Sequence, residues 1–530
     1  GYGKRQQSTL EGTLTFQHKF GELLDMNLMA GMGRYLDSGD GSDISYENAN
    51  DHIQGSSVGM ADGPFYPTSY KYKNEKRSQF VRGSFDLFGR YVVSASLRRD
   101  GTDKFFPSKK YALFPSVSLA WKMNEESFIK NISWINMLKL RASYGETGSD
   151  NLGTTLYGIV TTAREDVQFN NNSVTYIPYI LSGANYEDVT WQKTVMKNIG
   201  LDFSIFRDRI WGSVDVFRND VTHLLGTAPT ELLGMHGTRP INGGHYKRTG
   251  IDVSLNSLNL QTHDFKWTSQ ITMSHYNAVW IERMPNYDYQ KYQKRKNEPM
   301  NAFYYYKTTG IIDMDKSNMP ESQRSLGPAA CMPGYPIVED KNGDGIIDVN
   351  DSYMDNMLPK LYFGFGNTFT WKNFDLDIFM YGQLGVKKWN DAYSYSADAG
   401  NLSRGVDAHN VGIYSYNIWN TQTNTNGYFP GIAISKSVAL PENLGFDYTR
   451  ENASYIRVRN ITLGYNLGPK ELSVFKGYIR GIRVFVDFQN PLPFTKYKGY
   501  DPEINTSSSN LTGGQYPQMR VYSIGAKLAF

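Results

Sequence analysis

The chain has 530 residues, of which 40% are hydrophobic and 20% charged, and its formal net charge at pH 7 is +3. This length exceeds one soluble core of ordinary size, so the chain forms either several domains or one very large β-structure. Because the net charge is small, composition gives no reason to expect nucleic acid as a partner. No window approaches about 18 consecutive apolar residues, so no transmembrane helix is encoded, but membrane β-strands leave only a weak alternating pattern.

Apolar and polar residues alternate in segments of about ten residues, which is the length that a tilted membrane strand needs. The apolar rows, in chain order, are Val81, Gly83, Phe85 and Leu87; Val93, Ala95 and Leu97; Leu113, Pro115, Val117, Leu119 and Trp121; Leu138, Leu140, Ala142 and Tyr144; and Tyr522, Ile524, Ala526, Leu528 and Phe530. Residues such as Arg82, Ser116 and Lys139 lie between them. A soluble sandwich shows the same alternation, so the connections have to separate the two folds.

Short and long connections alternate along the chain. The short ones are 21–22, 88–90, 207–209, 259–264 and 372–373, and two of moderate length, 124–134 and 467–478, occupy the same places in the alternation. The long ones are 35–76, 100–110, 146–190, 221–245, 283–358, 387–451 and 491–515. Outer-membrane barrels combine short periplasmic turns with long extracellular loops, whereas a soluble β-protein has no reason to place every long loop at one end. The sequence therefore predicts an all-β, transmembrane antiparallel β-barrel.

The strands that the pattern delimits number about fifteen, whereas single-chain bacterial barrels have an even number. Phe530 ends a strand that runs toward the periplasm, and counting back gives the same direction to the strand 8–20. Residues 1–7 should then lie on the extracellular side, and they contain no signal peptide. We therefore expect further strands upstream, with residues 1–530 as the C-terminal part of a larger barrel.

Five segments, in order along the chain, resemble the SusC/RagA family of TonB-dependent outer-membrane transporters. They are YALFPSVSLAW (111–121), NMLKLRASYGETG (136–148), DKNGDGIIDVND (340–351), NASYIRVRNITLGYNL (452–467) and VFVDFQNPLPFTKYKGYDPEI (484–504). The resemblance covers about residues 77–530 and implies a barrel of ~22 strands with a plugged lumen, of which this chain would supply about fifteen. It also implies an N-terminal plug domain, a TonB-type energy coupler, and a SusD-like surface lipoprotein that acts as a lid.

Family members import oligosaccharides or peptides. This chain departs from the family pattern because no segment resembles the plug, the TonB-contacting segment or the leading strands. We therefore expect that the chain neither closes a barrel nor transports a substrate by itself.

The segment 340–351, within the long loop 283–358, matches the twelve-residue calcium loop. Its oxygen ligands for a structural Ca²⁺ would be Asp340, Asn342, Asp344, the carbonyl of Ile346, Asp348 and Asp351. Aspartate at the twelfth position replaces the usual glutamate, so its shorter arm would weaken the affinity. An ion would order a segment that otherwise has little core. The alternative is an acidic turn, rich in Gly and Asn, that holds no ion.

Aromatic residues fall into three groups. Phe530 is a terminal aromatic that resembles the signal read by the outer-membrane insertion machinery; the alternative is a last residue that faces lipid. Tryptophans near strand ends are expected in interfacial girdles: Trp121, Trp134, Trp191, Trp211, Trp267 and Trp371. Loop aromatics could stack on sugars or grip a peptide, the alternative being loop packing or contact with the lid protein: Tyr304, Tyr305, Tyr306, Trp389, Tyr393 and Tyr395.

No pattern indicates an enzyme. The eight His show no metal-ligand spacing, neither HExxH nor GxSxG occurs, and paired carboxylates such as Asp202 and Asp215 have no predicted pocket. The single cysteine, Cys331, has no evident catalytic partner and excludes an intramolecular disulfide.

The favoured function is energy-coupled import of oligosaccharides or peptides across the outer membrane of a Gram-negative bacterium. This chain would contribute the barrel wall, the extracellular loops and the surface on which the lid docks. A passive porin or a scaffold barrel of a surface assembly is the second hypothesis, and upstream sequence separates it from the first. A soluble or secreted β-rich binding protein is the third, which membrane fractionation would test.

Overall fold

The computed structural model describes most of the chain. The described residues are 2–46, 65–151, 161–163, 169–171, 174–176, 179–181, 187–229, 238–285, 289–294, 297–389, 417–429, 431, 440–468, 471–475, 478–498, 501–504 and 518–530. Gly1, for which the extracellular side was expected, lies outside them. No helix among these residues is long and apolar enough to span a membrane.

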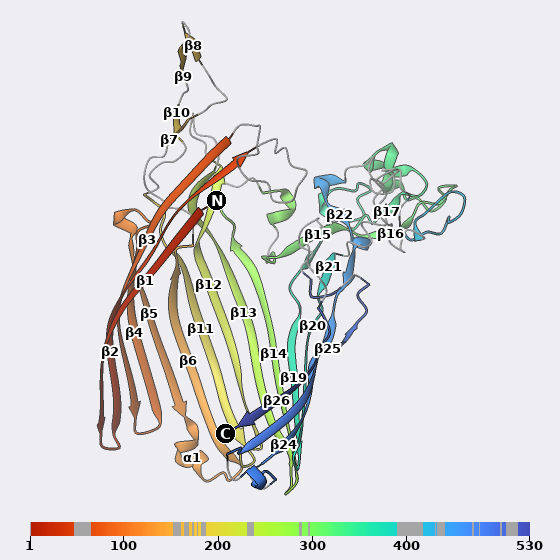
Figure 1. Ribbon diagram of the computed structural model, residues 1–530. Coiled ribbons are helices and arrows are strands. Elements are labelled where there is room, and N and C mark those ends of the chain that lie inside the picture. Colours follow the sequence, from red (N-terminus) through yellow and green to blue (C-terminus); the bar gives the residue numbers. More distant parts are fainter. Residues whose placement is uncertain are drawn as a thin grey trace.

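One antiparallel sheet of fifteen strands dominates the molecule (Figure 1), which confirms the expected all-β class and strand number. The strands are β1 (Tyr2–Phe20), β2 (Leu24–Tyr46), β3 (Phe65–Leu87), β4 (Tyr91–Thr102), β5 (Tyr111–Lys122), β6 (Ile135–Ser149), β11 (Gln192–Ile205), β12 (Ile210–Pro229), β13 (Thr238–Gln261), β14 (Phe265–Glu282), β19 (Leu361–Trp371), β20 (Phe374–Leu384), β24 (Tyr455–Leu467), β25 (Gly481–Thr495) and β26 (Val521–Ala529). Each strand pairs with the next one in this order, so the sheet is an up-and-down meander.

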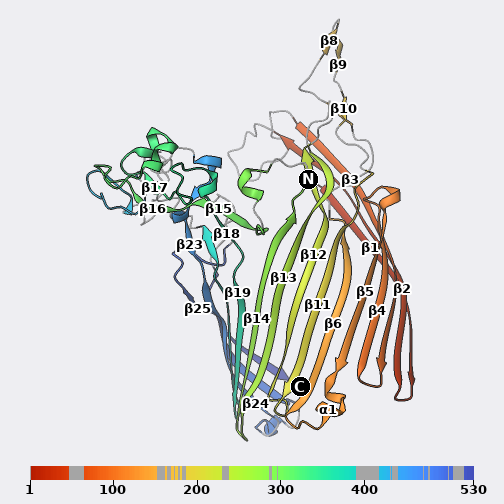
Figure 2. The ribbon, with the colours of Figure 1, turned by 180° about the vertical axis from the view of Figure 1, so that it is seen from behind.

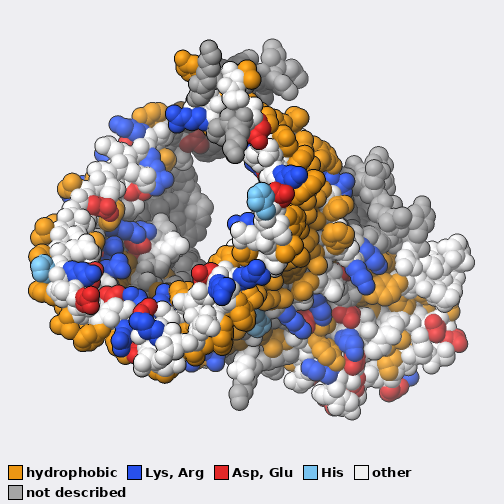
Figure 3. All heavy atoms as spheres, turned by 90° about the horizontal axis from the view of Figure 1, so that it is seen from below, with side chains coloured by type: hydrophobic (Ala, Val, Ile, Leu, Met, Phe, Trp, Pro, Cys, Tyr) orange, Lys and Arg blue, Asp and Glu red, His pale blue; other side chains and the backbone are white. Residues whose placement is uncertain are grey.

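The meander curves into a wall that surrounds an open space (Figure 3), and Figure 2 shows β4 to β14 side by side from behind. β1 and β26 are its two edge strands, and no pairing between described residues joins them. All 19 residues of β1 are exposed. The wall is therefore a curved sheet with two free edges.

The two faces of the wall differ as the alternation predicts. Leu119, Ala142, Ile199 and Val216 occupy one cross-strand row of the outer face, and Leu119 and Ile199 are 52% and 62% exposed. On the inner face, hydroxyl pairs link neighbouring strands, as in Ser96–Ser116 at 2.7 Å. Figure 3 shows hydrophobic side chains gathered on the outer rim of the ring. Apolar side chains thus face outward and polar ones line the interior.

Short connections gather at one end of the wall and long ones at the other. The N label lies at the long-loop end and the C label at the short-turn end (Figure 1), as strand counting predicts. Five of the six tryptophans expected in girdles belong to the short-turn end: Trp121, Trp134, Trp211, Trp267 and Trp371. The prediction for Trp191 was wrong. Trp191 lies at the long-loop end, only 8% exposed, in a cluster with Phe105, Phe114 and Val189.

Two of the expected long loops are shorter than predicted, because strands continue into them. β2 and β3 stay paired up to Tyr46 and Phe65, and β12 and β13 up to Pro229 and Thr238. The β2–β3 extension is polar on both faces, with Asp40 opposite Lys71, so hydrophobic alternation does not mark it. Cross-strand hydrogen bonds and ion pairs hold this part of the hairpin together.

Shorter elements lie in the connections. The remaining strands are β7 (Thr161–Ala163), β8 (Phe169–Asn171), β9 (Val174–Tyr176), β10 (Tyr179–Leu181), β15 (Ala302–Tyr306), β16 (Thr308–Ile311), β17 (Pro336–Val338), β18 (Tyr353–Asn356), β21 (Lys387–Trp389), β22 (Gly445–Phe446) and β23 (Arg450–Asn452). The helix α1 (Ser127–Lys130) lies at the short-turn end, and the 3₁₀-helices are 107–109, 123–125, 291–294, 321–326, 328–331, 349–351, 441–443, 447–449 and 473–475. Among the described residues, most of these elements belong to the extracellular connections.

Sidedness can be tested by charge substitution. Leu140→Arg places a cation on the outer face nearer the bilayer midplane and should destabilise the protein by ~2–4 kcal/mol, whereas Val117→Arg, in the row of Tyr144 closer to the extracellular end, should cost less. The matched controls Ser116→Arg and Lys139→Arg add or keep charge on the inner face, where they should be tolerated. The measurement is denaturant unfolding of the membrane-inserted protein. Equal losses on both faces would contradict the assignment of faces.

Candidate functional site: inner wall and extracellular lobe

A charged ladder crosses the inner face of β6, β11 and β12. Arg141 donates two hydrogen bonds to Asp202, at 2.9 and 2.7 Å, and one to Asp215 at 3.1 Å. Lys139 lies 2.8 Å from Asp202. Arg141 reaches across β11 at Gly200, where a Cβ atom would lie 2.8 Å from its guanidinium. Asp202 and Asp215, for which the sequence predicts no pocket, therefore neutralise cations on the water-facing side of the wall.

A groove runs along the inner face beside this ladder. It consists of two hollows of about 610 and 640 Å³ that share Asp252 and Ser274. The Arg248 guanidinium lies 4.6 Å from the centre of the Tyr276 ring, and that ring stacks on Tyr362 at 5.8 Å. Ser274 donates a hydrogen bond of 2.6 Å to Asp252. The groove combines aromatic faces with charged and amide groups, a combination that suits a polar solute with some apolar surface.

Sequence reasoning missed this groove. Arg248, Tyr276 and Tyr362 occupy inward positions of β13, β14 and β19. The alternation pattern identifies them only as residues on the inner face of the wall. Their proximity depends on strand register, which the sequence does not give directly. Two inward tyrosines on consecutive long strands were the only available signal.

A buried ion cluster ties an extracellular loop to the wall. Arg457 and Asp501 are 3% and 5% exposed, and their charged groups lie 2.7 Å apart. Arg457 also pairs with Glu503, which accepts hydrogen bonds of 2.7 and 2.8 Å from the Tyr381 hydroxyl. Burial lowers the pKa of nearby Lys388, although Asp501 and Glu503 oppose this effect. Removing one partner of such a pair typically costs about 3–5 kcal/mol, so this cluster is a strong anchor.

Two long connections fold together into an extracellular lobe, formed by residues 297–358 with 417–429 and 440–454. One core cluster contains Tyr306, Val338, Ile347 and Leu440. A second contains Ile312, Ala330, Tyr335 and Ile337, and Leu326 and Phe446 pack against both. In Figure 3 the described part of the lobe lies beside the ring rather than across it. The expectation that this long loop has little core was wrong.

The loop aromatics predicted to bind substrate belong largely to this core. Tyr304 and Tyr305 are each 9% exposed and Tyr306 is fully buried, with its hydroxyl 3.0 Å from the Asp348 carbonyl. Their rings leave no open face for a sugar to stack on, so loop packing, the alternative interpretation, describes them. Trp389 pairs through its backbone with Arg450. The Trp389 side chain, and Tyr393 and Tyr395 entirely, lie outside the described residues.

The twelve-residue acidic loop is closed by its own hydrogen bonds. Asp351 is fully buried, and its carboxylate accepts from the amides of Lys341, Asn342 and Asp348 at 2.9, 3.3 and 2.8 Å. Asp340 accepts from Gly343 and Gly345 at 2.7 and 2.9 Å, and both glycines have positive φ. The predicted ligands Asn342, Asp344 and Asp348 likewise accept hydrogen bonds from amides of the loop.

Within the described chain, no three Asp, Glu, His or Cys side chains converge closely enough to share a metal. The calcium site therefore stays a prediction. Calcium would require Asp340, Asp344 and Asp348 to turn toward a common point with the Ile346 carbonyl. Phe530, the predicted insertion signal, follows β26 and is 77% exposed.

The chain belongs to the TonB-dependent receptor-like β-barrel family, whose model matches residues 2–490. It is 27% identical to the TonB-dependent receptor P3 of Formosa agariphila over 100% of this chain and 53% of the relative. It is also 27% identical to the TonB-dependent receptor SusC of Bacteroides thetaiotaomicron over 87% of this chain and 44% of SusC. The chain thus spans about half the length of these curated relatives.

Solved structures confirm the fold. The RagAB peptide transporter superposes with a TM-score of 0.78 at 22% identity, covering 100% of this chain and 56% of the other. The RagAB peptide importer in its closed-closed state gives 0.77 at 21% identity, covering 100% of this chain and 56% of the other. The family model confirms a TonB-dependent receptor-like β-barrel, as the resemblance to the SusC/RagA family implied, and the protein is an outer-membrane β-barrel protein.

The pH dependence of the lobe follows from Tyr335. Burial raises the pKa of this hydroxyl to about 12, whereas in an unfolded chain it ionises near pH ~10. The hydroxyl stays protonated to a higher pH in the folded lobe than in the unfolded chain. The free energy of unfolding of the lobe should therefore fall by about 2–3 kcal/mol as the pH rises from about 10 to 12. Unfolding of the lobe, followed by hydrogen exchange across this range, measures the loss. The Tyr335→Phe variant should lose less stability over this pH range than the wild type. The control Tyr478→Phe, at an exposed position, should lose as much stability as the wild type.

The acidic loop gives a separate prediction. If calcium stabilises it, Ca²⁺ should protect the lobe from proteolysis, and a chelator or Asp340→Ala with Asp344→Ala should abolish that protection. Equal protection with and without chelator would rule out the ion. Asp351→Ala should loosen the lobe under either condition, because each buried amide left without an acceptor costs about 1–3 kcal/mol.

Proposed function

We propose that residues 1–530 form the C-terminal barrel part of an active importer for oligosaccharides or peptides, and that no chemical bond is made or broken in the process. The inner-wall groove carries the proposal. Arg248, Tyr276 and Asp252 face the hollow interior, where a solute crossing the barrel would meet aromatic and charged groups. Sugars and peptides both offer apolar faces flanked by hydrogen-bonding groups, which matches this lining.

The free edges support the existence of partner strands. In lipid, unpaired backbone N–H and C=O groups of an edge strand have no water to bond, so only closed barrels are stable across the membrane. β1 and β26 leave such edges. We infer that an upstream part of the same protein, or a companion chain, supplies the missing strands together with a plug domain and the segment that contacts a TonB-type coupler.

The extracellular lobe supports a lid partner. It has two cores of its own and projects from the long-loop end of β14, β19 and β20 (Figure 1). The loop 501–504 is fixed to the wall by the Arg457 cluster, which gives the rim a rigid point. We propose that the exposed faces of this lobe, rather than its buried tyrosines, contact a SusD-like lipoprotein. The similarity to SusC and RagAB favours this arrangement.

Uptake in cells that contain the complete protein tests the proposal. Arg248→Ala with Tyr276→Ala should reduce uptake of labelled oligosaccharides or peptides at least about tenfold, because two contacts are lost. The control Ser84→Ala, on the inner face of β3, should keep wild-type uptake. A protonophore should stop import by the wild type. Uptake that survives the protonophore would indicate a passive porin, and absence of uptake of either class would indicate a scaffold barrel.

A further inference from the structure

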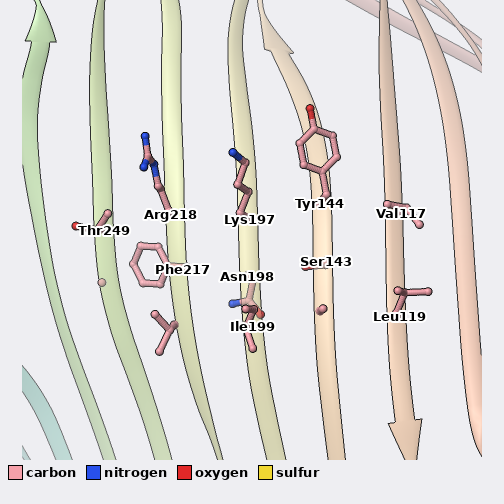
Figure 4. A pocket seen from close by; sticks show the side chains of 13 residues that line it. Val117, Leu119, Ser143, Tyr144, Lys197, Asn198, Ile199, Phe217, Arg218 and Thr249 are labelled. Carbon is pink, nitrogen blue, oxygen red and sulfur yellow. The ribbon is translucent and has the colours of Figure 1, made fainter.

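A second hollow lies on the opposite, lipid-facing side of β5, β6, β11 and β12 (Figure 4), with a volume of about 510 Å³. Its floor is the cross-strand row of Leu119, Ala142, Ile199 and Val216. Ala142 stands between the larger Leu119 and Ile199, and its small side chain leaves the depression. The floor is apolar and faces outward, so it can hold a hydrocarbon chain.

The next row toward the extracellular end changes character abruptly. Tyr144, Lys197 and Arg218 are direct cross-strand neighbours there. In Figure 4 the tyrosine hydroxyl, the lysine amine and the arginine guanidinium lie on one side of the apolar residues, away from the short turns. The segment from Lys197 to Ile205 at the end of β11 has nine residues, about the length with which a tilted strand crosses a bilayer. The two cations therefore lie near the outer boundary of the hydrocarbon layer.

Of the two cations in this row, Arg218 has a carboxylate partner and Lys197 has none among the described residues. Like charges directly opposite each other destabilise a sheet, and Lys197 opposes Arg218. Arg218 donates two hydrogen bonds of 2.8 Å to Asp220, which also contacts His245. In the part of the chain that the structure describes, no carboxylate forms an ion pair with Lys197, since the adjacent Glu146 pairs with Lys193 and accepts from Tyr144.

A comparison on the same face of the wall supports the need for an anion. Arg34 and Arg77 also oppose each other directly, on β2 and β3. There the Glu75 carboxylate accepts from both, at 3.0 and 2.6 Å. Glu75 thus bridges one like-charged pair, whereas no carboxylate of the described residues bridges Lys197 and Arg218.

We propose that the hollow binds one phosphorylated lipid of the outer leaflet, with its phosphate bridging Lys197 and Arg218 and an acyl chain on the apolar floor. A phosphate oxygen would accept from Lys197 and from the guanidinium hydrogens that Asp220 leaves unused. A lipid fits better than a free phosphate ion because the cations border an apolar hollow on the membrane side. This lipid site lies on the outer surface of the wall and is separate from the inner groove that is proposed for import.

Native mass spectrometry of the complete, delipidated protein in mild detergent tests the site. The probes are bisphosphorylated lipid A, the same lipid without phosphates, and inorganic phosphate alone. The wild type should bind the phosphorylated lipid at least about tenfold more tightly than the dephosphorylated one, since a hydrogen bond to a charged group contributes about that much. Lys197→Gln with Arg218→Gln should abolish this preference. Ala142→Leu should fill the hollow and weaken both lipids.

The control is Arg34→Gln with Arg77→Gln, which removes the same two charges from the same face and should keep the lipid preference. Heat-modifiable gel mobility verifies that each variant is folded. The proposal is overturned if the wild type shows no preference for the phosphorylated lipid, if the Lys197 and Arg218 variant keeps it, or if the control loses it equally. Binding of inorganic phosphate as tight as that of the lipid would also overturn it, by indicating a simple anion site.

Discussion

Backbone hydrogen bonding is the constraint on which the whole structure depends. A chain that crosses hydrocarbon has to satisfy each N–H and C=O internally, and this protein does so by pairing fifteen strands in sequence order. Pairing alternates the side chains between two faces, so each strand presents one face to lipid and one to the interior. The apolar row at Ala142 and the charged ladder at Arg141 are adjacent positions of one strand. The proposed lipid site on the outer face and the proposed solute groove on the inner face thus use the same strands.

Polar anchoring on the extracellular side follows from the same arrangement. Where the wall leaves the membrane, β2 and β3 continue as a hairpin with polar residues on both faces, whereas the β12–β13 extension packs Leu225 against the Trp191 cluster. The long connections form a lobe with its own core. The cluster of Arg457, Asp501 and Glu503 joins two of the segments that carry the family resemblance. Arg457 lies in one of these segments and Asp501 and Glu503 lie in the other, so together they fix a loop on the wall.

The sequence predicts the wall well and the sites poorly, for physical reasons. Alternation and loop asymmetry are local properties, so the strand number and the direction of the chain follow from them. The Arg248 groove and the Lys197–Arg218 pair depend on the register between neighbouring strands, which alternation does not encode. Trp191 was wrongly assigned to a girdle, and for Tyr304 to Tyr306 the alternative of loop packing describes the structure, because only packing decides whether such an aromatic ring is buried or exposed.

The outer face of the wall should contact lipid and the inner face should contact water. Single cysteines placed at Ile199 and Asn198, in a Cys331→Ser background, can carry spin labels on adjacent positions of β11. In membranes, frequent collision of a spin label with oxygen indicates that the label lies in lipid, and frequent collision with a water-soluble nickel complex indicates that it lies in water. We expect the label at Ile199 to be accessible to oxygen and the label at Asn198 to be accessible to the nickel complex. Equal water accessibility at both positions would contradict it.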